Sequence, residues 1–236
     1  GTITLLASTG DLTMDPTAEV NTLNGNQILD AGNGVDDQLV VGDLTAVAAN
    51  ISLTTTGSVL DADDASSGDD TDTDITAQNL RMVAGKGIGL LSGNSLGEPV
   101  NALETNVDLL AAKAEGSDGI HLVEADGLTV GDTGDITTQR VANDGSTSTN
   151  GEASLSDLVT TAINGPNGSI VLQLTNGNLT LEDGSLLAPD FLMAVSANGA
   201  GNVTLQANGT NGAIALGARV LSGSGNITLR TTPGGI

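Results

Sequence analysis

Residues 177–181 read Gly-Asn-Leu-Thr-Leu, residues 201–205 read Gly-Asn-Val-Thr-Leu, and residues 225–229 read Gly-Asn-Ile-Thr-Leu. Consecutive copies begin 24 residues apart, at positions 177, 201 and 225, which marks an internal repeat. A second series steps by 44 and then by 22 residues through Gly168-Ser169-Ile170, Gly212-Ala213-Ile214 and Gly234-Gly235-Ile236. We interpret the two series as two strand ladders that lie side by side.

Each copy alternates apolar, polar and apolar residues after a Gly-Asn turn, which is typical of a short, half-buried β-strand. Looser copies with Asp in place of Asn occur at residues 10–13, 42–45 and 134–137. Glycine and asparagine recur at such corners because they adopt a positive φ at low cost. The outward middle position of the strands is held by Thr4, Thr13, Thr45, Ser52, Thr129, Thr137, Thr180, Thr204 and Thr228.

Strands this short cannot bury a core within one repeat, so each repeat must stack on its neighbours. The sequence therefore predicts an all-β fold, a single-stranded parallel β-helix (β-solenoid) with turns of about 22–24 residues. We expect residues 1–236 to form one such segment of a longer protein, with loops inserted near 61–74 and 143–154. Residues 100–113 also fit a short amphipathic helix, although inside a solenoid we favour strand or irregular coil.

The composition supports thin aliphatic layers and excludes two classes of partner. The chain has one Phe, no Tyr, Trp or Cys, 33 Gly, and a formal net charge of -23. Nucleic-acid binding needs a basic surface and usually stacking aromatics, and an anionic membrane surface repels so acidic a chain. We expect no nucleic-acid partner and no direct membrane insertion, and the absence of Cys favours an extracellular location.

The strongest local feature is a run of acidic residues in the first inserted loop, Asp61, Asp63, Asp64, Asp69, Asp70, Asp72 and Asp74. Clustered carboxylates are the hard oxygen ligands that Ca²⁺ prefers, but no EF-hand spacing with a closing Glu is present. We favour a solvated, self-repelling loop, with a Ca²⁺ site as the alternative. Residues 31–37 partly resemble the repeat of calcium-binding β-rolls, which makes Asp36 and Asp37 a weaker second candidate.

Several stretches between residues 50 and 140 resemble the repeats of giant bacterial secreted surface proteins of the filamentous-haemagglutinin type. They are Gly57–Asp61, Ile75–Leu80, Val83–Gly89, Ala102–Val107, Leu110–Ala112 and Gly119–Leu122. The resemblance implies a right-handed β-helical shaft at or beyond the bacterial cell surface. It also implies contact with a host, neighbouring-cell or surface ligand and with adjacent repeats of the parent chain.

Other functions on a solenoid fit the residues less well. Polysaccharide-active enzymes use carboxylates beside Arg or Lys and aromatic sugar platforms, whereas Arg81, Arg219 and the other bases are scattered and no Tyr or Trp exists. An ice-binding face needs regular Thr pairs, and here most strands carry a single Thr. His121 lies between Ile120 and Leu122 at an outward position, where we expect a surface histidine rather than a base or ligand. We therefore expect no enzymatic activity.

Overall fold

The computed structural model describes residues 1–63, 72–91, 101–161, 168–184, 192–210 and 212–232. These residues form strands, turns and bends, and none of them is in a helix; accordingly, no helix among them is long and apolar enough to cross a membrane. The strands are β1 (Ile3–Ala7), β2 (Leu12–Thr13), β3 (Glu19–Asn21), β4 (Gln27–Ala31), β5 (Leu39–Val41), β6 (Asp43–Thr55), β7 (Val59–Asp61), β8 (Ile75–Ala84), β9 (Gly87–Ile88), β10 (Leu103–Ala114), β11 (Gly119–Glu124), β12 (Leu128–Val130), β13 (Ile136–Val141), β14 (Thr147–Glu152), β15 (Leu158–Thr160), β16 (Ile170–Leu174), β17 (Leu179–Leu181), β18 (Met193–Ala197), β19 (Val203–Ala207), β20 (Ile214–Leu216), β21 (Arg219–Ser222) and β22 (Ile227–Thr231).

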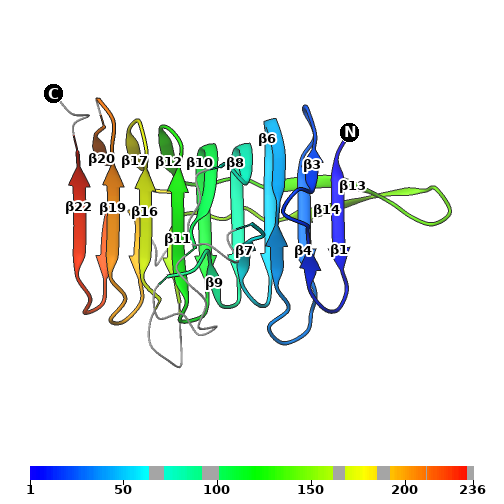
Figure 1. Ribbon diagram of the computed structural model, residues 1–236, viewed down its shortest axis with the longest axis horizontal. Coiled ribbons are helices and arrows are strands. Elements are labelled where there is room, and N and C mark those ends of the chain that lie inside the picture. The colour runs from blue at the N-terminus through cyan, green and yellow to red at the C-terminus, as the bar shows by residue number, and fades with distance from the viewer. Residues whose placement is uncertain (64–71, 92–100, 162–167, 185–191, 211, 233–236) are drawn as a thin grey trace.

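Twenty of these strands join in one continuous parallel sheet, and β13 and β14 form a separate antiparallel pair. Toward the C-terminal end each strand pairs with the third strand after it, so that β16, β19 and β22 are neighbours, as are β17 and β20, and β18 and β21. The chain thus passes through three faces before it returns beside itself. Figure 1 shows the successive turns lying side by side from β1 to β22, which is a β-solenoid-like arrangement.

We name the three faces by their strands. Face A holds β2, β5, β7, β9, the first residues of β10 (103–105), β11, β16, β19 and β22. Face B holds β3, the first parts of β6 and β8, the middle of β10, and then β12, β17 and β20. Face C holds β1, β4, the last parts of β6, β8 and β10, and then β15, β18 and β21.

The core consists of stacked aliphatic side chains, as the absence of large aromatics predicts. On face C one inward position is filled in successive turns by Leu5, Leu29, Leu53, Met82, Ala112, Leu158, Val195 and Val220. Outward threonines alternate with these buried positions, and Thr129, Thr180 and Thr204 are half-buried between buried neighbours. The predicted period-2 pattern is confirmed at these strands.

The predicted register is right at the C-terminal end and wrong one turn earlier. Val203 pairs with Ile227, 24 residues on, as the repeat indicates. Leu179, however, pairs with Ile214, and it is Ile170 that pairs with Val203. The copies at 177–181 and 201–205 therefore lie on faces B and A. Extra residues between successive strands lengthen these turns beyond 24 residues. Ile236, from the second predicted series, lies outside the described residues.

The segment expected as a loop at 143–154 is instead the turn and second strand of the β13–β14 hairpin. Thr137, expected in a solenoid strand, belongs to β13 of this hairpin. In Figure 1 the hairpin runs across the direction of the stacked strands and extends past β1. The polar Ser, Thr and Asn residues fit such a strand because each pairs across the hairpin while facing solvent.

Two further local predictions have clear outcomes. Residues 103–114 form β10, which confirms the strand interpretation over the helix. Glycine occurs at the corners for two separate reasons. At Gly177 the backbone has a φ of 94°, a conformation that glycine adopts at low cost, as expected. At Gly225, by contrast, an added Cβ would lie 2.2 Å from the carbonyl oxygen of Gly201 in the preceding turn, so close backbone approach requires the glycine there.

Candidate functional site

Three buried carboxyl groups gather where face A passes into face B. Asp61 ends β7, Asp74 directly precedes β8, and Glu104 lies on β10 in the next turn. The three residues are 4%, 5% and 5% exposed, and one oxygen from each carboxyl group lies within 4.8 Å of the others. We call Asp61, Asp74 and Glu104 the acidic corner. It brings together both ends of the first inserted loop and a strand of the following turn.

Backbone pairing fixes the acidic corner in place. The Asp74 N–H donates to the carbonyl oxygen of Glu104 at 3.0 Å, and the Glu104 N–H donates to Asp74 Oδ2 at 2.7 Å. Asp61 is aligned with Val41 in the strand pair β5–β7, and its Oδ1 accepts the N–H of Asp63 at 3.2 Å. The carboxyl groups are therefore held by ladder hydrogen bonds rather than by a free loop.

Burial and mutual repulsion raise the pKa values of carboxyl groups in this region. Burial first, and then the charge of Asp61, raise the pKa of Asp74 to about 10. Burial, followed by its interaction with Asp61, raises the pKa of the adjacent Asp63 to about 6. The ion pairs Arg81–Glu152, Lys86–Asp36 and Lys113–Glu115 lie elsewhere in the described structure and include neither Asp61 nor Asp74.

The structure divides the predicted acidic loop into parts with different environments. Asp61 and Asp74 are buried, so the expectation of a fully solvated loop is wrong at its two ends. Asp63 is half-buried and Asp72 is exposed, whereas Asp64, Asp69 and Asp70 lie outside the described residues. Sequence reasoning missed Glu104, because it lies in a strand 30 residues after Asp74 and only the stacking of turns brings it to the corner.

The second predicted pair of acids is not part of the acidic corner. Asp36 has a φ of 65° and forms an ion pair with Lys86, with 3.0 Å between Oδ2 and Nζ. Asp37 Oδ2 accepts the N–H groups of Gly10 and Gly34 at 3.0 and 2.8 Å. These contacts connect turns of the chain, which gives both residues a structural role.

One turn further along, Glu124 is a fully buried carboxyl group with several hydrogen-bond donors. Its Oε2 accepts the Thr105 hydroxyl at 2.7 Å, and its two oxygens accept the N–H groups of Val107 and Asp126 at 3.3 Å. Burial, the largest influence, raises the pKa of Glu124 to about 7 despite these donors. Glu124 therefore changes charge near neutral pH inside the folded protein.

Replacing Glu124 with Gln is expected to stabilise the protein at pH 8 by about 2 kcal/mol and to have little effect near pH 4.5. The pKa of about 7 in the folded state lies above the ordinary value of 4.5, so the stability that Glu124 contributes is present below pH 4.5 and is lost as the pH rises through 7. Urea unfolding between pH 4.5 and 8 measures this difference. Glu182→Gln, at an exposed position, serves as the control. If E124Q follows the same pH dependence as the wild type, the buried carboxyl is not the cause.

Two residues at outward strand positions are buried in the structure. His121, expected at the surface, is 5% exposed, and its Nδ1 lies 3.1 Å from the carbonyl oxygen of Leu90. Leu90 in turn pairs with Asn101 in an antiparallel bridge. The expectation of a surface histidine is therefore wrong, since alternation along a strand identifies the outward side but not what lies over it.

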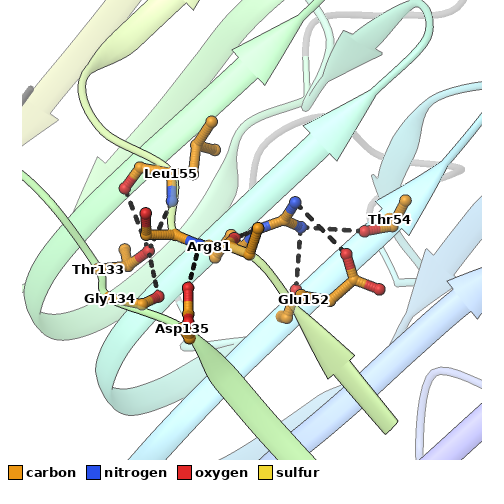
Figure 2. Close-up of polar contacts among 10 residues, drawn as sticks. Thr54, Arg81, Thr133, Gly134, Asp135, Glu152 and Leu155 are labelled. Atoms are coloured by element: carbon orange, nitrogen blue, oxygen red, sulfur yellow. Dashed lines mark hydrogen bonds and ion pairs between the residues drawn. The ribbon is translucent and has the colours of Figure 1, made fainter. Parts of the chain in front are cut away.

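Arg81 on face C is the second such residue, and it connects the solenoid to the hairpin. Its Nε donates to the carbonyl oxygen of Ala153 at 2.9 Å, and its Nη2 lies 3.4 Å from Glu152 Oε2. Its Nη1 donates to the hydroxyl groups of Ser52 and Thr54 at 3.1 Å. Figure 2 shows the guanidinium between Thr54 and Glu152. All these contacts are structural, which explains the burial of an outward base.

The base of the hairpin is fixed by its own hydrogen bonds. The Thr133 N–H donates to the carbonyl oxygen of Leu155 at 2.9 Å, and Asp135 Oδ1 accepts the Ser154 N–H at 2.8 Å (Figure 2). Toward the other end, the Thr138 hydroxyl lies 2.7 Å from that of Thr4. The hairpin therefore spans face C from β8 to β1.

The comparisons with known proteins add no family to this geometry. The resemblance to surface proteins of the filamentous-haemagglutinin type rests on the sequence alone. Function has to be argued from the stacked turns, the acidic corner and the hairpin. Comparison of the chain with protein-family models, with curated proteins and with solved structures finds no match.

Proposed function

We propose that this chain is a non-enzymatic shaft segment of a large bacterial cell-surface or secreted protein of the adhesin type. In this proposal the solenoid-like stack is a right-handed, single-stranded parallel β-helix whose basic turn is about 24 residues long. The observation that supports it most is the continuous parallel pairing from β1 through β22 around one aliphatic core. Such a structure holds two points apart, which is the task of a spacer.

The mechanism of a shaft is mechanical. Parallel hydrogen bonds connect each turn to the next, and stacked, fully buried side chains such as Leu29 and Leu53 form the interior. Stability in such an arrangement is a sum of contributions from each turn and from each contact between turns. The net charge of -23 keeps the exposed strands soluble and discourages pairing between the edges of separate chains.

Contacts with a host, a neighbouring cell or another surface ligand would be made by the segments that project from the stack. The described candidates are the exposed turn of the hairpin, residues 142–146, and a groove of about 910 Å³ on face C beside the hairpin base. Lys113 and Asp157 line this groove together with Ser196 and other Ser, Thr and Asn residues. Variable segments on a fixed scaffold are the usual place for such contacts.

An antibody raised against the hairpin turn tests where the protein acts. We expect it to label intact cells of the source organism, or their culture medium, and to reduce attachment of those cells to surfaces. A matched antibody against a peptide from the buried strand β16, which the folded protein does not display, is the control. Labelling that requires permeabilised cells would contradict the proposal.

Pulling the purified chain by its two ends tests the mechanical part of the proposal. We expect turns to detach in succession, with length increments of about 80 Å for each 24-residue turn. The expected order begins at β22, whose residues are all exposed, rather than at the buried central strands. Atomic force spectroscopy measures the increments. A single cooperative rupture at low force would be inconsistent with a shaft.

A further inference from the structure

We propose that Asp61, Asp74 and Glu104 together bind one Ca²⁺ ion that ties two successive turns of the solenoid at the root of the first inserted loop. This binding site goes beyond the shaft function proposed above. Asp61 and Asp74 mark where the loop leaves and rejoins the stack, and Glu104 belongs to the following turn. An ion at this point would connect β7, the start of β8 and β10.

The first argument is the free-energy cost of burying three carboxylates close together. Each of the three carboxyl groups is at most 5% exposed, and their oxygen atoms lie within 4.8 Å of one another. Removing a carboxylate from water costs several kcal/mol unless a countercharge compensates it, and three at this separation also repel one another. Such a cluster either shares protons or holds a cation.

The second argument concerns one atom of the acidic corner. Asp61 is 4% exposed, and no described residue donates a hydrogen bond to its buried Oδ2. Its other oxygen, Oδ1, already accepts the N–H of Asp63. A buried carboxylate oxygen normally has a donor, since leaving it without one costs about 1–3 kcal/mol or more. A cation in contact with Oδ2 would supply the missing partner.

The ligand chemistry selects the ion. All three ligands are carboxylate oxygens, which suit hard cations, and the corner contains neither His nor Cys. Ca²⁺ binds oxygen atoms at about 2.3–2.6 Å, so its ligand oxygens lie no more than roughly 5 Å apart. The three carboxylate oxygens of the acidic corner, all within 4.8 Å of one another, are close enough to contact one such ion. Mg²⁺ binds at about 2.0–2.1 Å and keeps most of its water, which fits a buried three-carboxylate site less well.

The competing explanation is that the groups share protons and bind no ion. Without a cation, burial and the charge of Asp61 raise the pKa of Asp74, which favours this explanation. The two explanations differ in one respect that can be measured. If the cluster only shares protons, Ca²⁺ does not change the stability of the folded protein. If it binds a cation, Ca²⁺ removes the repulsion between the carboxylates and stabilises the folded protein.

The experiment compares thermal unfolding of the full chain in EDTA and in millimolar Ca²⁺, with isothermal titration of Ca²⁺ alongside. For the wild type we expect one bound ion and a rise in Tm of about 5 °C. Glu104→Gln is expected to unfold at or above the wild-type Tm in EDTA, because one like charge is removed. E104Q should also lose the calcium increment, by which we mean the rise in Tm between EDTA and Ca²⁺. Its affinity for Ca²⁺ should fall at least tenfold.

Asp108→Asn provides the matched control, because Asp108 lies on the same strand but is exposed. It should keep the full calcium increment. The proposal is overturned if wild-type Tm is the same in EDTA and in Ca²⁺, if E104Q retains the increment, or if Mg²⁺ raises Tm as much as Ca²⁺. Each of these results leaves the surface labelling expected of a shaft unchanged, so the two proposals can fail separately.

Discussion

Replacing Leu110 with Ala is expected to lower the free energy of unfolding by about 3–5 kcal/mol. Leu110 is fully buried on β10 and is aligned with Leu80 in the preceding turn and Val130 in the following one. Its truncation removes contacts with both turns and leaves a cavity that rigid ladders on either side cannot close. Urea unfolding followed by circular dichroism measures the change.

Leu229→Ala on β22 is the matched control, since Leu229 is 41% exposed. The same truncation there should cost less than about 1 kcal/mol because little area is lost from the core. The loss of unfolding free energy at Leu110 should be several times the loss at Leu229. Equal effects at Leu110 and Leu229 would show that the stack does not gain stability from contacts on both sides of a turn.

The second large effect is expected at Arg81, where Arg81→Ala should destabilise the protein by about 3 kcal/mol and release the hairpin from face C. The change leaves Glu152 without its cation and the carbonyl oxygen of Ala153 without its donor. It also opens space over Ser52, which is fully buried in the wild type. Limited proteolysis within residues 141–147 measures release of the hairpin, and urea unfolding measures stability.

Arg81→Lys separates charge from geometry, because Lys keeps the charge but cannot donate in the same fork. It should recover only part of the loss. Lys113→Ala removes a cation from the more exposed pair with Glu115 and should change stability by less than about 1 kcal/mol. If Arg81→Ala leaves the hairpin as resistant to protease as in the wild type, the contacts to Glu152 and Ala153 do not hold it.

The class of the fold could be predicted from the sequence because it depends on local pattern. The alternation at Leu179–Leu181 and Val203–Ala207 appears in the structure as inward and half-buried positions. Strand partners could be predicted only where the 24-residue repeat holds, as for Val203 and Ile227, because inserted residues shift the pairing of the other strands. Ala112 pairs with Leu158 across the whole hairpin insertion, and no pattern in the sequence indicates that distance.

The candidate site was only half predictable for the same reason. The run of aspartates marked Asp61 and Asp74, but their burial follows from the tertiary closure of the corner. Glu104 reads as an ordinary outward residue between Leu103 and Thr105. Likewise Arg81 and His121 are outward in the pattern, and only the folded structure shows that they are buried. Alternation determines the side on which a residue lies, whereas burial on the outer side depends on distant segments.

The hairpin also imposes an order of events on assembly. It contacts the first turn through Thr4 and Thr138, which are 134 residues apart in the chain. A chain that emerges N-terminus first completes β1 to β12 before the hairpin that covers face C has been made. During that interval the early turns depend on stacking alone, and Arg81 stays exposed to water. Closure of the hairpin over face C therefore follows the stacking of the first turns, to which it adds the contacts of Thr4 and Arg81.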